Sequence, residues 1–547
     1  MVDKEIEIEI KRPEFYLLIG FSLLVLYLEL QVTLNSPIAF GDEAFYTAIS
    51  KYMAEKVEYP VYIPLEATKI VKFTYSRPPL WNFLEASFYF LFGFNEVIVK
   101  FLVPFIAVMS GVACFILMKK IYSDKIALIA SILLITIPSF VTYSVLFYVD
   151  ILEIFWLVLA VSLTFLAVKT ESKKYWILSA IFSGLVILTK TTGLFLGFFY
   201  LFYFIYEMIS RKSLMVVVKK YWILVGVIAL IVGPWLLRNI YFYGNPSCSA
   251  LPFFSTKGCI VKPDYKPKND FIGRIAETGT ESSALKIGLI NYLNFAYGNV
   301  FLVPLTFLCG LMFLLKNRSK ENIILLIFLI ASFVIMLRTF ETRAEDFARY
   351  GLVAVPFIAI MSAMYLGQIT EFLKKYHTIL VYIFLAIILV AAFFNLNDKV
   401  VSARRFDDSS QTYVGYKMFS KSFLDACEWI KNNTPKDSLL LSLNTHPTIY
   451  NCQRNAIWEL DDLPDIILSN NVTLVLDRLK VNGINYIFVQ KFSLSNQAYR
   501  VSYPVSFVQF LDQNKNNFKN VYENGPSITT CANMGGCDGT IVYQVVG

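Results

Sequence analysis

Two adjacent carboxylates and a following arginine are the residues of this chain best suited to chemistry. Asp42 and Glu43 come directly after the first long apolar segment, and Arg77 follows about 35 residues later, before Pro78-Pro79. A carboxylate can act as a general base, and an arginine can bind phosphate through charge-assisted hydrogen bonds. Their order suggests chemistry on a lipid-linked anionic substrate at a membrane surface. The alternative is a solvated helix start, where acidic residues are common.

Other charged residues are predicted to lie on the same side of the membrane. Asp150 opens the fourth apolar segment, where an ionisable group is costly, and Glu153 lies one turn further in. An interfacial helix cap is the alternative for Asp150, and snorkelling to headgroups is the alternative for each cation. The cations predicted on this face are Arg77, Lys190, Arg238, Arg338, Arg343 and Arg349.

The composition is that of a membrane protein. Of the 547 residues, 56% are hydrophobic and 16% are charged, whereas soluble domains are about 25% charged. The net charge of +8 lies in short loops between apolar runs, which argues against nucleic-acid binding. The first apolar segment is longer than a signal-peptide core and has no cleavage site, so it is interpreted as a retained anchor.

About eleven segments are long and apolar enough to span a bilayer. The loops between them alternate in charge, and the positive-inside rule then places the N-terminus in the cytoplasm and residues after about 400 outside the plasma membrane. The predicted spans are 15–34, 97–118, 125–146, 151–168, 175–189, 193–209, 221–237, 298–315, 322–338, 351–371 and 377–395.

Three outside segments are long. The first contains two stretches, Ala44 to Met53 and Leu80 to Phe92, whose apolar residues recur at helical spacing, and these predict interfacial helices. Pro78-Pro79 would start the second, because proline is tolerated in a first helical turn. The outside segments are 35–96, 238–290 and 396–547.

The chain divides into a transmembrane domain, 1–400, and a small extracytoplasmic α/β domain, 401–547. In the latter, long apolar runs vanish and charged and amide residues become common. Helices are predicted over Ser422 to Asn432 and Val472 to Val481. Strands are predicted over Ser438 to Leu443 and Tyr486 to Gln490.

Cysteine placement fits an oxidising exterior. Cys114 and Cys309 lie in predicted spans, and the other six lie in predicted outside segments. Proximity in sequence suggests the pairs Cys248–Cys259, Cys427–Cys452 and Cys531–Cys537. A four-cysteine metal site is the alternative, weakened by the absence of CxxC spacing.

Several enzyme classes are disfavoured. The chain has two histidines, His377 and His446, which disfavours a histidine-based triad or a histidine-rich zinc site. It has neither a Walker loop nor a GxGxxG after a strand, so soluble nucleotide donors are not supported.

The ordered motifs resemble the GT-C membrane glycosyltransferases that use polyprenyl-phosphate sugars. The most similar branch contains the protein O-mannosyltransferases and lipid A aminoarabinose transferases, families 39 and 83, here of a bacterial or archaeal type. The resemblance covers about residues 14–395. The matching residues and stretches are Asp42-Glu43 with Tyr46, Arg77-Pro78-Pro79-Leu80-Trp81, Asn95-Glu96, Asp150, Leu188-Thr189-Lys190 with Gly193, Pro234-Trp235, Arg238-Asn239, Gly244-Asn245-Pro246 and Arg349-Tyr350.

The resemblance implies residue roles and a fold: a polytopic helical membrane protein with interfacial helices in the first outside loop. It implies that Asp42 is the catalytic base, that Glu43 helps to position the acceptor, and that Asp150 is a second active-site carboxylate. It implies substrate contacts from Tyr46, Arg77, Lys190, Arg238, Arg349 and Tyr350. Aminoarabinose transferases carry a metal-binding Glu where this chain has Ser76, so no metal or other cofactor is carried over.

The expected reaction is an inverting transfer of a sugar from a dolichyl- or undecaprenyl-phosphate to a hydroxyl of a protein, lipid or glycan. The alternative from another class is a lipid-phosphate transporter or flippase. It is disfavoured because transporters place key charges near the bilayer midplane, often in repeated halves. A membrane scaffold whose tail binds a partner is the third alternative.

Overall fold

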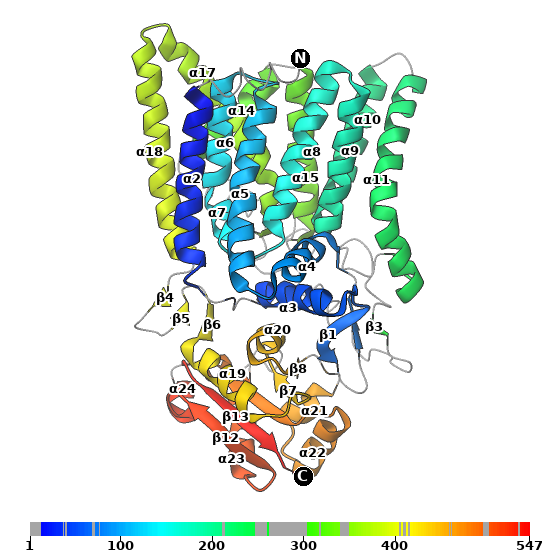
Figure 1. Cartoon of the computed structure of the whole chain (residues 1–547), viewed down its shortest axis with the longest axis vertical. Helices are drawn as coiled ribbons and strands as arrows, with labels where there is room; N and C mark the ends of the chain where they lie inside the picture. Colours follow the sequence, from blue (N-terminus) through cyan, green and yellow to red (C-terminus); the bar gives the residue numbers. More distant parts are fainter. Residues whose placement is uncertain are drawn as a thin grey trace.

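A bundle of apolar helices and a smaller C-terminal α/β region lie end to end in the computed structural model (Figure 1). The structure describes residues 13–546 with gaps, the longest of which are 247–259, 262–302, 340–348 and 496–502. A helix lies on each segment predicted to span the membrane. These helices are α2 (Pro13–Thr33), α5 (Glu96–Met118), α6 (Asp124–Thr136), α7 (Pro138–Ser144), α8 (Asp150–Thr170), α9 (Lys173–Thr189), α10 (Phe195–Ser210), α11 (Leu214–Tyr243), α14 (Val303–Lys316), α15 (Lys320–Thr339), α17 (Val355–Lys374) and α18 (Thr378–Ala403).

Within the described residues, seven helices are long and apolar enough to cross a membrane, and the bent pair α6–α7 would make an eighth. The bend of 59° corrects the prediction of one continuous span over 125–146. Its cause is Pro138, which lacks an N–H and disfavours helical geometry at Ile137, where φ is −60° and ψ is 128°. The predicted class of a polytopic helical membrane protein is confirmed.

Two helices cross the end of the bundle that faces the C-terminal region (Figure 1). We call this end of the bundle the sheet-side end. The two helices are α3 (Gly41–Lys56) and α4 (Leu80–Phe92), and they confirm the two helices predicted in this loop. Helix α4 starts directly after Pro79 and ends at Gly93, whose φ of +77° suits glycine. Helix α3 begins with Asp42 in its first turn, where a carboxylate complements the helix dipole.

A small antiparallel sheet, which the sequence did not reveal, joins two segments that are distant in the chain. Its order is β1 (Tyr62–Ala67), β2 (Lys72–Thr74), β3 (Ile260–Val261), so the segment between α2 and α5 is tied to the segment after α11. A second three-stranded sheet follows α18 and leads into the C-terminal region. It comprises β4 (Phe406–Asp407), β5 (Thr412–Tyr413) and β6 (Tyr416–Ser420).

The C-terminal region is built on a mixed five-stranded sheet in the order β12-β13-β9-β7-β8. Strand β7 pairs in parallel with β8 and β9, and β13 pairs antiparallel with β9 and β12. The elements are α19 (Lys421–Asn433), β7 (Leu439–Ser442), α20 (Thr445–Pro447), η3 (Thr448–Cys452), β8 (Asn455–Ile457), α21 (Leu463–Ile467), α22 (Val472–Val481), β9 (Tyr486–Gln490), η4 (Lys491–Ser493), β10 (Leu494–Ser495), β11 (Tyr503–Pro504), α23 (Val505–Gln513), β12 (Phe518–Asn524), α24 (Ile528–Asn533) and β13 (Thr540–Val545). All four elements predicted here are confirmed.

The central strands are buried on both faces, as alternation along β9 shows. Ile487 packs in a cluster with Leu479 of α22 and Leu511 of α23. Phe488 packs on the opposite face with Phe423 of α19, in a cluster that also contains Tyr148 from the turn before α8. The hydrophobic core of the C-terminal region therefore includes a residue from the helical bundle.

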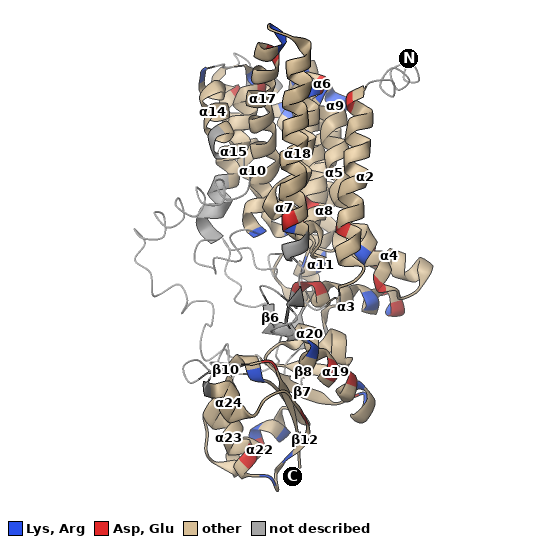
Figure 2. Cartoon of the chain, turned by 90° about the vertical axis from the view of Figure 1, so that its left-hand side faces the viewer, with Lys and Arg blue, Asp and Glu red and all other residues tan. Residues whose placement is uncertain are grey.

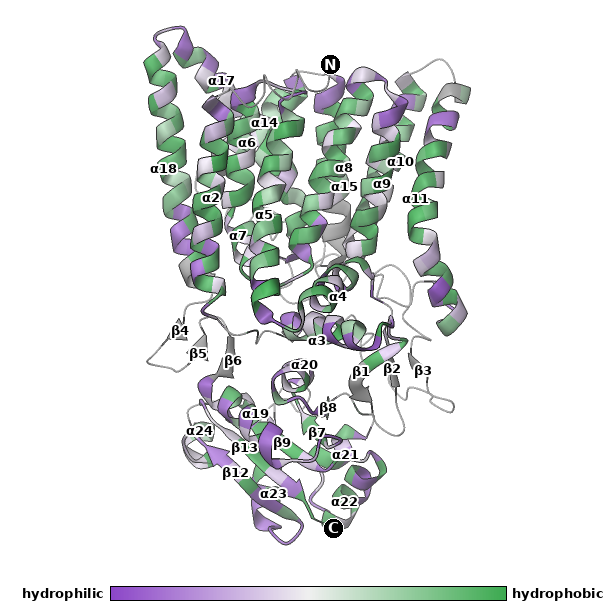
Figure 3. Cartoon of the chain, viewed as in Figure 1, coloured by the Kyte–Doolittle hydropathy of each residue, from purple (hydrophilic) through white to green (hydrophobic). Residues whose placement is uncertain are grey.

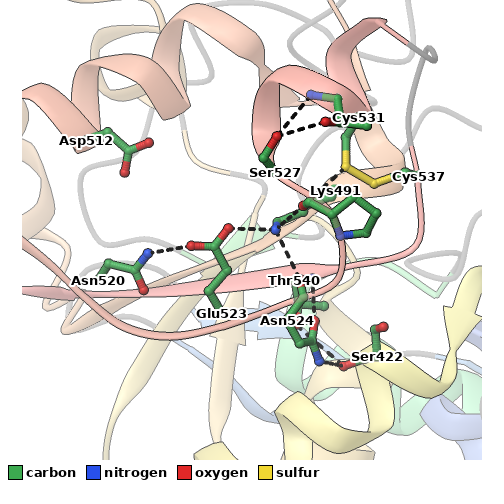
Figure 4. Close-up of polar contacts among 12 residues, drawn as sticks. Ser422, Lys491, Asp512, Asn520, Glu523, Asn524, Ser527, Cys531, Cys537 and Thr540 are labelled. Carbon is green, nitrogen blue, oxygen red and sulfur yellow. Dashed lines mark hydrogen bonds and ion pairs between the residues drawn. A yellow bond between two sulfur atoms is a disulfide. The ribbon is translucent and has the colours of Figure 1, made fainter.

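A buried lysine, Lys491, joins the end of β9 to the end of β12 in this sheet (Figure 4). The ammonium of Lys491 donates to Glu523 Oε1 at 2.7 Å and to the carbonyl oxygens of Asn524 and Pro526 at 3.0 and 2.6 Å. Its side chain is fully buried, and these three bonds use all of its donors, so it has a structural role.

Two predicted disulfides are confirmed, Cys427–Cys452 and Cys531–Cys537. Cys114 and Cys309 are free and lie on helices of the bundle, as expected. The predicted pair Cys248–Cys259 lies outside the described residues.

Charged and apolar residues are distributed differently in the bundle and in the C-terminal region. Basic residues gather at the bundle end opposite the C-terminal region (Figure 2), and the bundle is apolar while the C-terminal region is mixed (Figure 3). This multi-span architecture agrees with a membrane location.

Candidate active site

Four separate elements deliver charged side chains to the sheet-side end of the bundle. Asp42 is in the first turn of α3, Asp150 begins α8, Lys190 follows α9, and Arg349 precedes the short helix η2 (Gly351–Ala354). The chain turns tightly after Lys190 because Gly193 packs against the end of α9. A Cβ on Gly193 would lie 2.6 Å from the Val186 side chain. The glycine thus fixes where the lysine projects.

These residues form a continuous chain of ion pairs. Arg349 Nη1 donates to Asp42 Oδ2, and Arg349 Nε donates to Asp150 Oδ2 at 2.9 Å. The other oxygen of Asp150 accepts from Lys190 Nζ at 2.5 Å. Lys190 Nζ is also 3.9 Å from Glu153 Oε2. Asp150 is 1% exposed, so its charge is stabilised by these two cations rather than by water.

Arg77 continues this chain on the other side of Asp42. Its Nη1 is 4.0 Å from Asp42 Oδ1 and donates a hydrogen bond of 2.8 Å to the hydroxyl of Tyr46. Its guanidinium carbon lies 4.5 Å from the centre of the Phe45 ring. The side chain is 40% exposed, the most open of the cations in the site. Asp42 is therefore flanked by two arginines with different surroundings.

The two arginines set the protonation state of Asp42. Burial alone would raise the pKa of this carboxyl, but the positive charge of Arg349, then that of Arg77, outweighs it. The net result is a pKa well below the ordinary range, so Asp42 is ionised at neutral pH. His446 contributes a smaller effect in the same direction.

Three other predicted residues have different surroundings. Glu43 is fully buried, and its Oε1 accepts from the backbone N–H of Phe147 at 2.8 Å, which ties α3 to the turn before α8. Arg238 donates to the carbonyl oxygens of Pro60 and Tyr75 at 2.6 and 3.3 Å, so it holds the segment between α3 and α4. The ring of Tyr350 lies 4.9 Å from Lys190 Nζ. Their predicted substrate roles stay predictions.

Two more of the predicted cations lie beyond what can be described. The side chain of Arg338 and the whole of Arg343 fall outside the described residues.

A buried polar network lies between α3 and α4. Ser50 on α3 donates to Glu85 Oε2 at 2.9 Å and accepts from Asn82 Nδ2 at 2.7 Å, both on α4. Asn82 also donates to the carbonyl oxygen of Tyr46 at 3.0 Å. Burial raises the pKa of Glu85 to about 7, partly offset by the hydrogen bond from Ser50. The network fixes the helix that carries Asp42 and Tyr46.

Sequence reasoning missed two residues of this site. His446, on α20 of the C-terminal region, lies with its ring 4.5 Å from that of Phe45. Tyr148 lies under Arg349, with 4.5 Å between the guanidinium carbon and the ring centre. The Tyr148-Val149-Asp150 order could have drawn attention to Tyr148, but nothing local marks His446.

No group of three or more His, Cys, Asp or Glu residues that could hold a metal ion occurs in the described part of the chain.

Comparison with known proteins agrees with the predicted fold. Residues 76–237 match the family model described as Dolichyl-phosphate-mannose-protein mannosyltransferase. That match includes Arg77, Asp150 and Lys190, and excludes Asp42 and Arg349. No curated protein sequence matches the chain.

Several solved structures share the fold. The oligosaccharyltransferase of Archaeoglobus fulgidus, in complex with zinc and sulfate, has a TM-score of 0.65 at 16% identity, covering 93% of this chain and 72% of its own. AglB from the same organism, with an inhibitory peptide and a dolichol-phosphate, has a TM-score of 0.62 at 14% identity, covering 98% and 74%. ArnT from Cupriavidus metallidurans, bound to undecaprenyl phosphate, has a TM-score of 0.59 at 13% identity, covering 97% and 98%. The chain therefore has the GT-C fold of membrane glycosyltransferases, which confirms the predicted resemblance.

Proposed function

We propose that this protein transfers a sugar from a polyprenyl-phosphate donor to a hydroxyl acceptor at the sheet-side end of the bundle. The observation that carries the proposal is the ion-pair chain from Arg77 through Asp42, Arg349 and Asp150 to Lys190. It puts an ionised carboxylate beside several cations at the end of apolar helices, where a lipid-linked phosphate would lie.

The cations supply what the leaving group needs. A polyprenyl phosphate departs as an anion, and preorganised positive charge stabilises charge that develops in the transition state. Arg349 and Arg77 both reach Asp42, so a phosphate bound between them would lie next to the base. Asp150 is buried between Arg349 and Lys190 and would hold both cations in place before the donor arrives.

Asp42 is the base in this proposal. It takes the proton from the acceptor hydroxyl while the oxygen attacks the anomeric carbon, and the bond from that carbon to the phosphate oxygen breaks. The configuration inverts because the attack comes from the face opposite the leaving group. The low pKa of free Asp42 makes it a weak base. A bound phosphate would draw the positive charge of the arginines toward itself and raise that pKa when the donor is in place.

The related structures support the donor class. The solved neighbours named above include one bound to a dolichol-phosphate and one bound to undecaprenyl phosphate. We also infer that the N-terminus is cytoplasmic, that the bundle lies in the plasma membrane, and that residues 401–547 form a separate extracytoplasmic domain. The basic end of the bundle in Figure 2 supports this orientation.

The test is release of free polyprenyl phosphate by the purified protein. Short-chain polyprenyl-phosphate mannose, glucose and aminoarabinose would each be offered with a Ser/Thr peptide, a glycan or a glycolipid, with and without chelator. Acceptor-dependent release is the expected result, and the chelator arm reports metal dependence. Binding of lipid phosphate without release from any donor would overturn the proposal and favour lipid-phosphate transport.

A further inference from the structure

A short helix of the C-terminal region contacts the helix that carries Asp42. Helix α20 packs against α3, and its His446 lies against Phe45, which is one turn beyond Asp42. Figure 1 places α20 directly between α3 and the five-stranded sheet. A residue some 400 positions later in the sequence therefore contacts the helix that carries the proposed base.

The loop that carries His446 is held from both sides. Asn444 donates to Gln490 Oε1 at the end of β9, and Thr445 Oγ1 donates to the carbonyl oxygen of Ser442 at 3.3 Å. The next helix, η3, ends at Cys452, which is bonded to Cys427 of α19. His446 is thus presented by a braced element rather than by a free loop.

Phe45 connects His446 with the charged site. The Phe45 ring has His446 at 4.5 Å and the guanidinium of Arg77 at 4.5 Å. His446 also acts electrostatically on the Asp42 carboxylate. The bundle and its first loop supply the cations, while the C-terminal region supplies an imidazole that is only partly buried.

The charged residues of the site and His446 come from different parts of the molecule. Arg349, Asp150 and Lys190 come from the ends of the spanning helices, from which a lipid-linked donor would approach. His446 comes from the polar region beyond the bundle. An imidazole N–H can donate a hydrogen bond to a hydroxyl oxygen.

We propose that His446 is a positioning residue for the acceptor hydroxyl, and that the acceptor enters between α3 and the C-terminal region. The inference rests on the proposed function and names the side from which its second substrate arrives. His446 would hold the hydroxyl oxygen toward the anomeric carbon while the proton goes to Asp42. The bond from that carbon to the phosphate oxygen breaks, and the phosphate leaves as an anion.

The test compares donor and acceptor kinetics in His446→Ala and His446→Gln. Polyprenyl-phosphate sugar would be the donor, and a Ser/Thr peptide and a soluble glycan would be separate acceptor arms. We expect KM for the acceptor to rise about tenfold in His446→Ala, the factor expected for one lost hydrogen bond. Donor affinity should stay unchanged, and His446→Gln should recover part of the loss because an amide can also bond a hydroxyl.

Two controls separate this role from simple docking of the C-terminal region. Tyr450 donates to Glu96 Oε1 at 2.7 Å across the same junction, so Tyr450→Phe loosens docking without removing His446. His377 lies between α17 and α18 and is exposed, so His377→Ala is a matched histidine control. Both should keep the wild-type acceptor KM.

An unchanged acceptor KM in His446→Ala, or an equal rise in Tyr450→Phe, would overturn the inference while leaving the proposed function intact. Absence of release by the wild type with every donor would instead overturn the proposed function. These two failures are distinguishable because the wild type is measured first.

Discussion

Arg349 bonds two carboxylates at once, and the charge balance of the site depends on it. Its Nη1 donates to Asp42 and its Nε to Asp150, while its guanidinium lies over the ring of Tyr148. A lysine would have to reach both carboxylates from one nitrogen, whereas Arg349 reaches them from two, Nη1 and Nε. When the donor binds, Arg349 could exchange its hydrogen bond to Asp42 for one to the phosphate.

The low pKa of Asp42 predicts how the reaction rate depends on pH. The ionised carboxylate is the active form, so the rate falls as the pH drops through its pKa. The pH dependence of kcat/KM reports the free enzyme and that of kcat reports the complex. We expect the acid limb of kcat to lie at higher pH than the acid limb of kcat/KM for the donor, because the bound phosphate offsets the arginines.

Arg77→Gln provides the matched comparison for that profile. It removes one of the cations that lower the pKa of Asp42, so the acid limb of kcat/KM should move to higher pH. Identical limbs in wild type and variant would show that Arg77 does not act on the group that titrates.

At the scale of elements, α3 and α4 form the support of the site. Ser50, Asn82 and Glu85 connect the two helices through buried hydrogen bonds, and they fix the helix that carries Asp42 in its first turn.

Glu85 makes the stability of this support depend on pH. Burial raises its pKa from 4.5 to about 7, so the folded state holds a proton that the unfolded state has released. The contribution of Glu85 to the free energy of unfolding is therefore fully present below about pH 4.5 and is lost as pH rises through about 7. In Glu85→Gln this part of the dependence of stability on pH should vanish, and the variant should be more stable than the wild type above pH 7.

Thermal unfolding in detergent between these pH values checks the prediction. Glu428, an exposed carboxylate on α19, provides the control variant Glu428→Gln, which should keep the wild-type slope. If the stability of Glu85→Gln depended on pH as that of the wild type does, Glu85 would not be the group responsible.

The elements were predictable from the sequence where their signals are local. Long apolar runs marked the spans, Pro78-Pro79 marked the start of α4, and a short run of aromatic and β-branched residues marked β9. The break at Pro138 also has a local signal, which the length of the apolar run concealed. The sheet of β1, β2 and β3 has none, because its strands are short and β3 is far away in sequence.

The charged residues of the candidate site could be picked out from the sequence, but their pairings could not. Asp42, Asp150 and Lys190 stand out as charges beside apolar segments. That Arg349 bridges two of the carboxylates follows from helix packing, which brings together residues 199 positions apart. The approach of His446 to Phe45 depends on docking of the C-terminal region, for which sequence spacing carries no signal.

At the scale of the whole molecule, the bundle and the C-terminal region are joined by a shared core. Tyr148 packs with Phe423 and Ile449, and it also supports Arg349. The C-terminal region thus contacts both the proposed acceptor side and the turn that leads to Asp150. We expect the two parts to act as one unit in catalysis.

The orientation of the molecule is directly testable. An epitope inserted in the exposed turn at Lys436 and Asp437 should be reached by antibody on intact cells or spheroplasts. An epitope at Glu171, between α8 and α9 at the opposite end of the bundle, should be reached only after permeabilisation. The reverse pattern would contradict the proposed topology, because basic loops would then face outward.

The central claim is that Asp42 is the base of a polyprenyl-phosphate glycosyl transfer, and Asp42→Asn tests it most directly. Donor binding and polyprenyl phosphate release would be measured on the same preparation, with Asp437→Asn, an exposed carboxylate of the C-terminal region, as the control. We predict that Asp42→Asn lowers turnover about 10²–10⁴-fold with donor binding retained, and that Asp437→Asn matches the wild type. Wild-type turnover in Asp42→Asn would contradict the account.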